Sequence, residues 1–383
     1  MEDVYIVEAL RTPIGRRNGS LSKIHPVDLF SKVVSAAVVK SGLEPGLVDH
    51  FIGGCVGQFG EQAVNISRNA WLSAGFPEEV VATTVDRQCG SSLQALQFGF
   101  AEIASGVSDI VVAGGIESMS RIPMMSNITP QSMPVTESLK RRYALEDGWF
   151  SQARGAQMIA DKYNISRERM DEMSFLSHVK AHKNSSHSMN EKVPILLDSE
   201  ERRVTEDEGI RANASLEKMS ALPPAFRGLD KITAGNSSQI SDGASACIIA
   251  SESAVKTHSL RKRARLIAFS YAGVNPEIML TGVIPATSRV LRKAGMKSDD
   301  VDIFEVNEAF ASVPLAWMQE TGVDEDRLNP FGGAIALGHP LGATGTRIVS
   351  TMVNELEVTG KKRGLIAICE GGGMANSCIL EKT

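Results

Sequence analysis

The segment SGLEPGLVDHFIGG at residues 41–54 returns in the second half of the chain as AGMKSDDVDIFEVN at residues 294–307. The two copies align without a gap, and a glycine, a valine, an aspartate and a phenylalanine hold the same four positions in both. Each copy has its glycine where a helix would end, followed by an apolar run typical of a strand. The repeat predicts that the chain contains two similar units.

The sequence around the two copies extends the correspondence. The apolar run at 109–115 ends in two glycines, and so does the run at 364–372. A helix-like stretch precedes each run, starting at Cys89 in the first half and near Gly342 in the second. Buried strands that alternate with helices favour an α/β protein, so we expect two lobes, each a sheet covered by helices.

The sequence between the lobes, from residue 120 to residue 237, has a different character. It contains a proline-bearing stretch without a clear period and a polar, charge-rich stretch, which indicates a long insertion. Insertions of this size often cover a functional site. Met170, Met173 and Leu176 follow a helical spacing and are interpreted as core residues of a helix at 167–180. The predicted domains are 1–119, completed by about 238–258, for the first lobe, 120–237 for the inserted loop domain and 259–383 for the second lobe.

The composition is that of an ordinary globular protein. Of the 383 residues 43% are hydrophobic, so the chain can bury large cores. A net charge of -5 and a pI near 5.9 give no reason to expect a polyanion partner, which disfavours nucleic acid. No apolar run approaches the ~20 residues of a spanning helix, and the chain start is typical of a strand and not of a signal peptide. We expect a cytoplasmic protein without a membrane partner.

Five cysteines show no paired spacing and no CxxC motif, which indicates reduced thiols. Cys89 stands where a β-branched run stops and a helix of small residues begins. The helix dipole and nearby amides at such a position are expected to lower the pKa of a thiol and favour the nucleophilic thiolate. A buried structural cysteine is the alternative interpretation, and we prefer it for Cys55, Cys247 and Cys378 because their surroundings are apolar or strand-like.

Three further positions carry candidate chemistry. His339 lies in the glycine-rich stretch NPFGGAIALGHPLGATG at 329–345, where backbone is expected to approach something closely and the imidazole could act as a base. Cys369 ends a buried strand beside glycines whose free amides could serve an oxyanion. Asn307 and Glu308 end a strand and start a helix, and a helix N-cap is the alternative there. The cysteines and His339 lack zinc-ligand spacing, so we expect no metal site.

These segments resemble the thiolase family in an order that runs nearly end to end. CGSSLQA from Cys89 is similar to the nucleophile segment, NEAFA from Asn307 to the asparagine segment, the stretch at 329–345 to the histidine segment, and CEGGGMA from Cys369 to the second cysteine segment. EALRTPIG at 8–15 and TAGNSSQISDGASA at 233–246 extend the resemblance. Four segments in the order of the family identify it far more specifically than any single segment would.

The resemblance implies a role for each of these residues. Cys89 would attack a thioester or ketone carbonyl after His339 removes its proton, giving a covalent acyl-enzyme. Cys369 would exchange protons with the acetyl-CoA carbon or the leaving group. One oxyanion pocket would use the backbone N–H groups of Cys89 and Gly371, and the other would use His339 and a water held by Asn307.

The resemblance also implies a fold and a set of ligands. The fold would be α/β, with duplicated αβαβα lobes of five strands each, helices packed between them, and an inserted loop domain that binds coenzyme A. Arg211, Phe226 and Ser238 match family positions that contact the nucleotide or pantetheine. Coenzyme A and acyl-CoA would be substrates, with no permanently bound cofactor, and the protein would form a homodimer or homotetramer.

Three features depart from the family pattern. Asp86, three residues before Cys89, would oppose thiolate formation if it pointed inward, unless it pairs with Arg87 or another cation. Glu370 replaces the apolar residue that many members have. SQA at 151–153 stands where acetoacetyl-specific biosynthetic members often carry HisMetGly. DRQC before the helix together with CEGGGMAN looks more like degradative acyltransferases, some of which act on bulky acyl groups.

The leading hypothesis is therefore a thiolase that uses CoA to cleave 3-ketoacyl-CoA into acetyl-CoA and a shortened acyl-CoA. The alternative is an acetyl-CoA acetyltransferase that condenses two acetyl-CoA into acetoacetyl-CoA. A non-catalytic protein that binds lipid or CoA would be expected to lack a catalytic residue, yet Cys89, His339 and Cys369 are all present. A decarboxylating ketoacyl synthase would also use a cysteine nucleophile, but the second cysteine fits carbanion chemistry from acetyl-CoA better.

Overall fold

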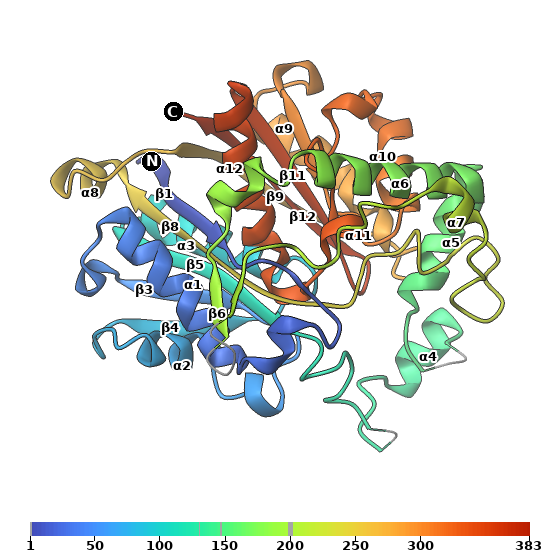
Figure 1. Ribbon diagram of the computed structural model, residues 1–383, viewed down its shortest axis with the longest axis horizontal. Coiled ribbons are helices and arrows are strands. Elements are labelled where there is room, and N and C mark those ends of the chain that lie inside the picture. The colour runs from blue at the N-terminus through green and yellow to red at the C-terminus, as the bar shows by residue number, and fades with distance from the viewer. Residues whose placement is uncertain (1, 130, 146–147, 198–201) are drawn as a thin grey trace.

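A single mixed β-sheet runs through the centre of the protein (Figure 1). The computed structural model describes residues 2–129, 131–145, 148–197 and 202–383. In spatial order the strands of the sheet are β10 (Ile303–Val306), β11 (Arg363–Glu370), β12 (Met374–Lys382), β9 (Ala264–Gly273), β1 (Val4–Arg11), β8 (Ser241–Ser251), β5 (Ile110–Ser118), β3 (His50–Gly54) and β4 (Val81–Val85), with β2 (Gly15–Arg16) beside β8. A separate hairpin is formed by β6 (Ile195–Leu197) and β7 (Arg202–Val204).

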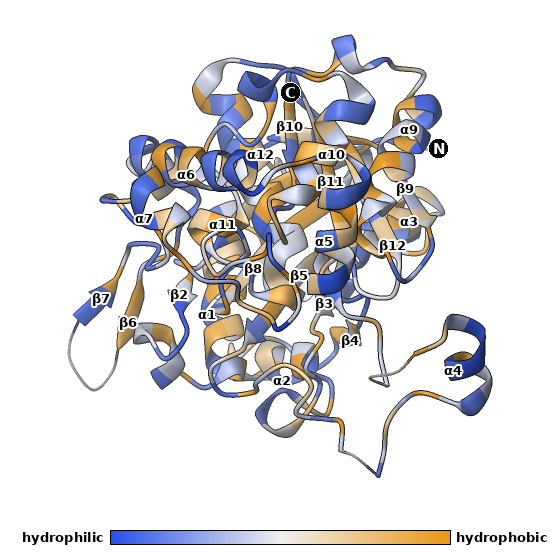
Figure 2. Cartoon of the chain, turned by 90° about the vertical axis from the view of Figure 1, so that its right-hand side faces the viewer, coloured by the Kyte–Doolittle hydropathy of each residue, from blue (hydrophilic) through white to orange (hydrophobic). Residues whose placement is uncertain are grey.

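Most of the helices cover the two faces of this sheet. In chain order they are α1 (Pro26–Ser41), α2 (Ile66–Ser73), α3 (Ser91–Ala104), α4 (Glu137–Tyr143), α5 (Gln152–Lys162), α6 (Arg167–Lys183), α7 (Leu216–Ser220), α8 (Glu252–Thr257), α9 (Val283–Ala294), α10 (Ser312–Thr321), α11 (Ala334–Leu337) and α12 (Thr344–Thr359). Figure 2 shows hydrophobic residues gathered on the central strands and hydrophilic residues on the outer helices.

The two halves of the sheet repeat one arrangement, as the duplicated segment predicts. Helix α1 ends at Gly42 (φ +71) and α9 ends at Gly295 (φ +66), a left-handed conformation that glycine adopts without steric cost. In each half the strand that follows, β3 or β10, pairs in parallel with β5 or β11. Strands β1 and β9 pair only through Tyr5–Arg265 and Ile6–Ala264, and this short contact joins the halves. The helix-stop-strand prediction is confirmed in both copies.

The second half differs from the five-stranded expectation. The first half contains β1, β8, β5, β3 and β4, whereas within the described ranges the second half has four strands. An isolated parallel bridge between Phe304 and Leu328 stands at its edge in place of a fifth. The chain turns immediately afterwards at Asn329 (φ +43), and Pro330 has no amide hydrogen to continue the pairing.

Helices α3 and α12 pack side by side against one face of the sheet. Leu93 and Leu96 of α3 and Ile348 and Val349 of α12 share one buried cluster with residues of both sheet halves. Helices α1 and α2 cover the first half from the opposite face, and α9 and α10 cover the second. This layering sets the N-termini of α3 and α12 next to each other. The Thr346 amide at the start of α12 donates to Ser92 Oγ at the start of α3 over 3.0 Å.

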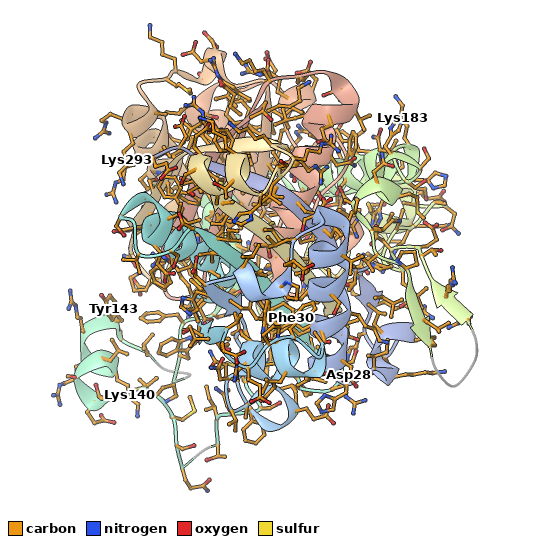
Figure 3. The ribbon with its side chains drawn as sticks, turned by 90° about the vertical axis from the view of Figure 1, so that its left-hand side faces the viewer. Asp28, Phe30, Lys140, Tyr143, Lys183 and Lys293 are labelled. Carbon is orange, nitrogen blue, oxygen red and sulfur yellow. The ribbon has the colours of Figure 1, made fainter. Side chains whose placement is uncertain are left out.

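The segment from 120 to 237 adds α4 to α7 and the β6–β7 hairpin. Met170 and Met173 of α6 are buried and Leu176 is half-buried, so the predicted core role of the two methionines is confirmed. Ser166 caps this helix, since its Oγ accepts from the Arg169 amide over 3.1 Å. Figure 3 shows α4, with Lys140 and Tyr143, standing away from the sheet. In the part of the chain that the structure describes, every helix is too short or too polar to cross a bilayer.

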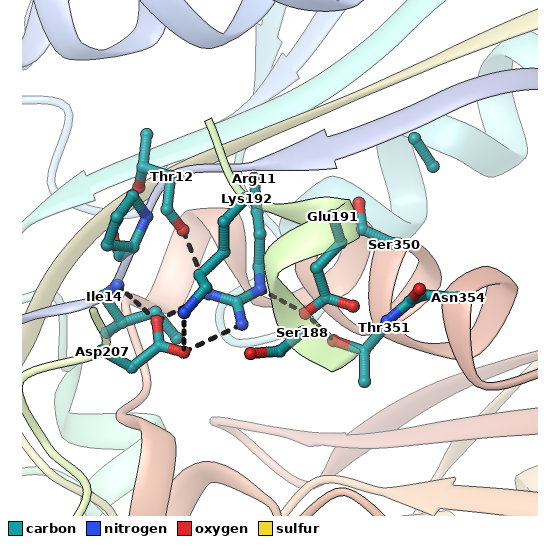
Figure 4. Close-up of polar contacts among 12 residues, drawn as sticks. Arg11, Thr12, Ile14, Ser188, Glu191, Lys192, Asp207, Ser350, Thr351 and Asn354 are labelled. Atoms are coloured by element: carbon teal, nitrogen blue, oxygen red, sulfur yellow. Dashed lines mark hydrogen bonds and ion pairs between the residues drawn. The ribbon is translucent and has the colours of Figure 1, made fainter. Parts of the chain in front are cut away.

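A buried ion cluster fastens this segment to the sheet (Figure 4). Arg11, at the end of β1, is 1% exposed; its Nε donates to Glu191 over 2.6 Å and its Nη1 to Asp207 over 2.6 Å. Thr351 of α12 donates to the same Glu191 oxygen over 3.0 Å. Burial alone would raise the pKa of Asp207, but the Arg11 guanidinium outweighs it and holds that pKa below its usual range. The cluster therefore joins β1, the inserted segment and α12 through buried ion pairs and hydrogen bonds.

Replacing Arg11 with methionine is expected to lower the free energy of unfolding by about 3–5 kcal/mol, because Glu191 and Asp207 then stay buried without their main counter-charge. Denaturant titration followed by circular dichroism measures the change. Lys140→Met is the matched control: it removes a cation from an exposed pair with Glu137, so its effect should stay below about 1 kcal/mol. Equal effects of the two substitutions would contradict the role assigned to the cluster.

Candidate active site

Cys89 lies in the tight turn that links β4 to α3. Gln88, the residue before it, has φ +49, an uncommon conformation for a residue with a side chain. The turn is held because Asp86 Oδ1 accepts from the Gln88 amide over 2.7 Å and Ser91 Oγ accepts from the Arg87 amide over 2.8 Å. Helix α3 starts two residues later, with Gly90 at its N-cap. The predicted position of Cys89 at a helix start is confirmed.

The thiol of Cys89 is buried and lies near enough to the second cysteine to affect its pKa. Burial raises the pKa of Cys369 well above the ordinary value, and the neighbouring Cys89 raises it further. The backbone amides of Cys89 and Gly371 act on the Cys89 sulfur to lower its pKa. Gly371 lies in the β11–β12 turn, where an added Cβ would approach Gln88 Oε1 to 2.9 Å. Cys89, Cys369 and Gly371 are thus brought together.

The expectation of a lowered pKa for Cys89 is wrong. Burial raises the pKa of Cys89 to about 12, and the carboxylate of Glu370 acts in the same direction. The two amides oppose this shift but do not overcome it. In the free protein the sulfur is therefore a thiol, and it needs a base to become a nucleophile.

His339 is a buried imidazole whose tautomer is set by its neighbours. Its Nδ1 lies 2.7 Å from Thr344 Oγ1, and that hydroxyl donates its only hydrogen to the Pro340 carbonyl over 2.8 Å. Nδ1 must therefore carry the proton, which leaves the lone pair on Nε2. Burial, followed by the charge of Arg347, lowers the pKa of His339 to about 3, so the ring is neutral at physiological pH. The result is a neutral imidazole whose Nε2 carries the lone pair and can accept a proton.

Asn307 stands beside this imidazole. Its amide nitrogen Nδ2 lies 3.4 Å from His339 Nε2, and its Oδ1 is buried without a partner. Its backbone N–H donates to Ala367 O over 3.0 Å, which ties it to β11 two residues before Cys369. The N-cap alternative is wrong, because α10 begins only at Ser312. An orphaned buried acceptor next to a base is a place where a water would be held, since water can donate to it.

Glu308, the next residue, has a structural role. Its carboxylate accepts from Ser177 Oγ over 2.7 Å, from Asn329 Nδ2 over 2.9 Å and from the Ile335 amide over 3.1 Å. It therefore fixes helix α6 of the inserted segment to the glycine-rich stretch that carries His339.

Close backbone contacts explain the glycines of that stretch. A Cβ on Gly345 would collide with the backbone of Leu93 in α3, and one on Gly342 would reach Ile116 O at 2.5 Å. The expectation that backbone approaches something closely is confirmed, and what it approaches is the first half of the molecule. The loop that carries His339 is thereby pressed against the helix that follows Cys89.

A cavity of about 220 Å³ adjoins the site from the side of the inserted segment. Arg211 lines it together with His178 and Gln239, and the Gln239 carbonyl accepts from the His339 amide over 3.2 Å. Burial, followed by the charge of Arg211, lowers the pKa of His178 to about 4, so its ring is neutral. Sequence reasoning missed His178 and Gln239, since one lies within an ordinary helix pattern and the other in a loop.

The other two predicted CoA contacts lie outside this cavity. Phe226 is 46% exposed, and Ser238 is half-buried with its amide donating to Ala309 O over 2.9 Å. The latter bond sets Ser238 beside the segment that begins at Asn307. The structure therefore places Arg211 on the cavity wall, Ser238 next to the candidate site and Phe226 on the surface.

The remaining cysteines are buried and unpaired, as expected for structural residues: Cys55, Cys247 and Cys378. Across the described ranges no group of three or more histidine, cysteine, aspartate or glutamate side chains is arranged to hold a metal ion.

Known proteins match the chain along its whole length. Residues 4–253 match the family described as thiolase, N-terminal domain, and residues 260–382 match thiolase, C-terminal domain. The steroid 3-ketoacyl-CoA thiolase FadA6 of Mycobacterium tuberculosis is 47% identical, over 100% of this chain and 95% of that protein. The 3-oxoadipyl-CoA/3-oxo-5,6-dehydrosuberyl-CoA thiolase of Escherichia coli is 38% identical over the full length of both.

Solved structures share the fold. The crystal structure of human mitochondrial 3-ketoacyl-CoA thiolase superposes with a TM-score of 0.91 at 35% identity, covering 100% of this chain and 99% of that one. The acetyl-CoA acetyltransferase of Bacillus anthracis gives the same TM-score, identity and coverage. Because these matches reach from one end of the sequence to the other and agree with the duplicated α/β architecture, the chain belongs to the thiolase family.

Proposed function

We propose that this protein is a 3-ketoacyl-CoA thiolase, which uses coenzyme A to cleave a 3-ketoacyl-CoA into acetyl-CoA and a shortened acyl-CoA. The observation that carries the proposal is that two buried thiols and the Gly371 amide act on one another, while the neutral imidazole of His339 contacts Asn307, which is bonded to β11 two residues before Cys369. Two relatives are named as thiolases of 3-ketoacyl-CoA and 3-oxoadipyl-CoA, which supports thiolytic cleavage over the condensation of two acetyl-CoA.

In the first half-reaction Cys89 is the nucleophile. His339 Nε2 accepts the thiol proton as the sulfur attacks the 3-keto carbon. A thiol pKa of about 12 and an imidazole pKa of about 3 mean that the resting pair is neutral, so the proton moves only when attack occurs. The amides of Cys89 and Gly371 then donate to the oxyanion that forms at that carbon.

Cleavage of the carbon–carbon bond leaves an acyl group on Cys89 and the enolate of acetyl-CoA. Cys369 donates its thiol proton to the enolate carbon, and its high pKa keeps that proton available until the carbanion needs it. Protonated His339, and a water held by the unpaired Oδ1 of Asn307, stabilise the enolate oxygen. The thiol of a second coenzyme A then gives its proton to the Cys369 thiolate and attacks the acyl-cysteine. The shortened acyl-CoA is released, and protonated His339 returns a proton to the departing Cys89 sulfur.

We also propose that the inserted segment at 120–237 is a separate loop domain that binds coenzyme A, between lobes at 1–119 with about 238–258 and at 259–383. Arg211 supplies a positive charge at the mouth of the cavity that adjoins His339. Phe226 and Ser238 would contact other parts of the same ligand. Reduced, buried cysteines fit a cytoplasmic location, and family resemblance favours a homodimer or homotetramer.

Arg211→Ala is expected to raise KM for coenzyme A about 10-fold with kcat nearly unchanged, because a charge-assisted hydrogen bond to a phosphate is lost in both ground and transition states. Steady-state thiolysis at varied CoA measures both constants. Arg169→Ala is the control, since Arg169 pairs with Glu325 and does not line the cavity. A loss confined to kcat would contradict this placement of coenzyme A.

The proposed activity is tested by incubating the protein with CoA and 3-ketoacyl-CoA thioesters of increasing acyl size, and measuring acetyl-CoA release by liquid chromatography. We expect CoA-dependent cleavage, faster for acyl groups larger than acetoacetyl. Activity confined to acetoacetyl-CoA and acetyl-CoA would favour the acetyltransferase. Binding without cleavage of any substrate would favour a non-catalytic CoA-binding protein.

A further inference from the structure

Glu370 is a fully buried carboxylate in the segment of Cys369, and it faces the segment that carries Cys89. It directly follows Cys369 at the end of β11. Its two oxygens accept from Arg87 Nε over 3.2 and 3.1 Å. Arg87 stands two residues before Cys89, so this ion pair joins the segment 369–371 to the turn that carries the nucleophile.

The two segments are packed together without free space at this point. A Cβ on Gly90 would collide with Glu370 Oε1, so only glycine fits directly after the nucleophile. Asn376 of β12 donates to the Gly90 carbonyl over 2.9 Å. A Cβ on Gly371 would in turn approach Gln88, the residue before the nucleophile. Among these contacts between the nucleophile turn and the C-terminal strands, the Arg87–Glu370 pair is the ionic one.

The charge of Glu370 disfavours the chemistry of Cys89. It raises the pKa of the thiol, second only to burial, and Glu117 adds a smaller rise in the same direction. Burial raises the pKa of Glu370 itself to about 8 against the attraction of Arg87, with Asp86 adding to the rise. The pair is therefore ionic above that pH, and below it Arg87 Nε still donates to a carboxyl oxygen of Glu370. Because the charge of Glu370 makes Cys89 harder to ionise, we look for its role in the way it holds the two segments together.

The Arg87 side chain also contacts an aromatic ring on its exposed side. Its guanidinium lies 5.2 Å from the centre of the Tyr271 ring on β9, and Lys293 faces the same ring at 5.9 Å. Asp86, the neighbouring carboxylate, bonds to Gln88 instead of pairing with Arg87. Arg87 is thus directed inward to Glu370 by contacts from β9 and from its own turn.

We propose that Arg87 and Glu370 are positioning residues whose ion pair fixes the nucleophile turn on the segment 369–371, so that the Gly371 amide stays aimed at the Cys89 sulfur. The inference rests on the proposed function, in which Cys89 is the nucleophile and the Gly371 amide serves the oxyanion. Misplacement of such a donor by about 1 Å lowers a rate by roughly 100-fold.

The test compares two reactions of Cys89 in Glu370→Met and Glu370→Gln. Alkylation by iodoacetamide needs only the thiolate, whereas acetylation by acetyl-CoA also needs the Gly371 amide. Both variants remove the charge, so the pH midpoint of alkylation should fall in both. Glu370→Met cannot accept from Arg87, and its acetylation rate should fall by about 100-fold. Glu370→Gln keeps an acceptor, and its acetylation rate should stay within about 10-fold of the original.

Further variants separate positioning from other effects. Arg87→Met breaks the same pair from its partly exposed side and should slow acetylation as Glu370→Met does, which keeps the test available if the latter fails to fold. The double variant should lose no more than the worse single one. Glu381→Gln is the matched control, because it weakens the ion pair with Arg363 at the opposite end of β11 and β12 and should change neither reaction.

Acetylation that rises together with alkylation in Glu370→Met would overturn the inference, since the role would then be electrostatic alone. Equal slowing of both reactions would overturn it as well, by showing a general loss of structure. Both results leave the proposed function intact as long as the unmodified protein is acetylated by acetyl-CoA. Absence of acetylation in the unmodified protein would count against the proposed function itself.

Discussion

Cys89→Ser is expected to lower the rate of 3-ketoacyl-CoA cleavage by about 10⁵-fold or more, the scale of loss seen when an enzyme's nucleophile is removed. A serine hydroxyl ionises far less readily than a thiol, and an imidazole whose pKa is about 3 is too weak a base to compensate. CoA-dependent release of acetyl-CoA measures the rate. Intact-protein mass spectrometry after incubation with acetyl-CoA should show no acetyl adduct on the variant.

Cys247→Ser is the matched control for this substitution. Cys247 is equally buried but lies within β8, where its sulfur faces the Thr346 carbonyl. The control should keep its acyl-enzyme and a turnover within about 2-fold, since it makes no contact with the reacting carbon. A normal acetyl adduct on Cys89→Ser would show that another residue is the nucleophile.

Cys369→Ala is expected to separate acylation from cleavage. Transfer of an acetyl group from acetyl-CoA to Cys89 breaks no carbon–carbon bond, so the variant should still form the acetyl-enzyme. Cleavage of 3-ketoacyl-CoA needs a proton delivered to the enolate carbon, and the loss of that donor should slow it by about 10²- to 10⁴-fold. Single-turnover acetylation and steady-state thiolysis measure the two steps.

Cys378→Ser serves as the control for the second cysteine. Cys378 is buried in β12, which pairs with the same strand β11, yet it is displaced from Cys369 in register because its partner is Ile366. Full turnover by Cys369→Ala would remove Cys369 from the mechanism. A loss of acetylation equal to the loss of cleavage would assign it a role in the first step instead.

Much of the fold follows from short-range signals. Gly42 and Gly295 end their helices in the left-handed conformation that glycine favours, and the apolar runs after them become paired strands. The position of Cys89 ahead of α3 follows from the change from β-branched to small residues. These features depend on neighbours in the sequence, which is why the sequence predicts them.

The charge state of the site depends on long-range contacts that the sequence does not reveal. A thiol at a helix start suggested a lowered pKa, whereas burial and Glu370 raise the pKa of Cys89 instead. Arg87 stands next to Asp86 in the sequence, but it pairs with Glu370 from the far end of the chain. The N-cap interpretation of Asn307 fails for a similar reason, since its side chain turns to His339.

The most direct test of the account is the location of the acyl group in the unmodified protein. The protein is incubated with acetyl-CoA, digested at acidic pH and analysed by tandem mass spectrometry. The account predicts one acetyl group, on Cys89, which coenzyme A removes again. An acetyl group found on Cys369 or on any other residue in place of Cys89 would contradict it.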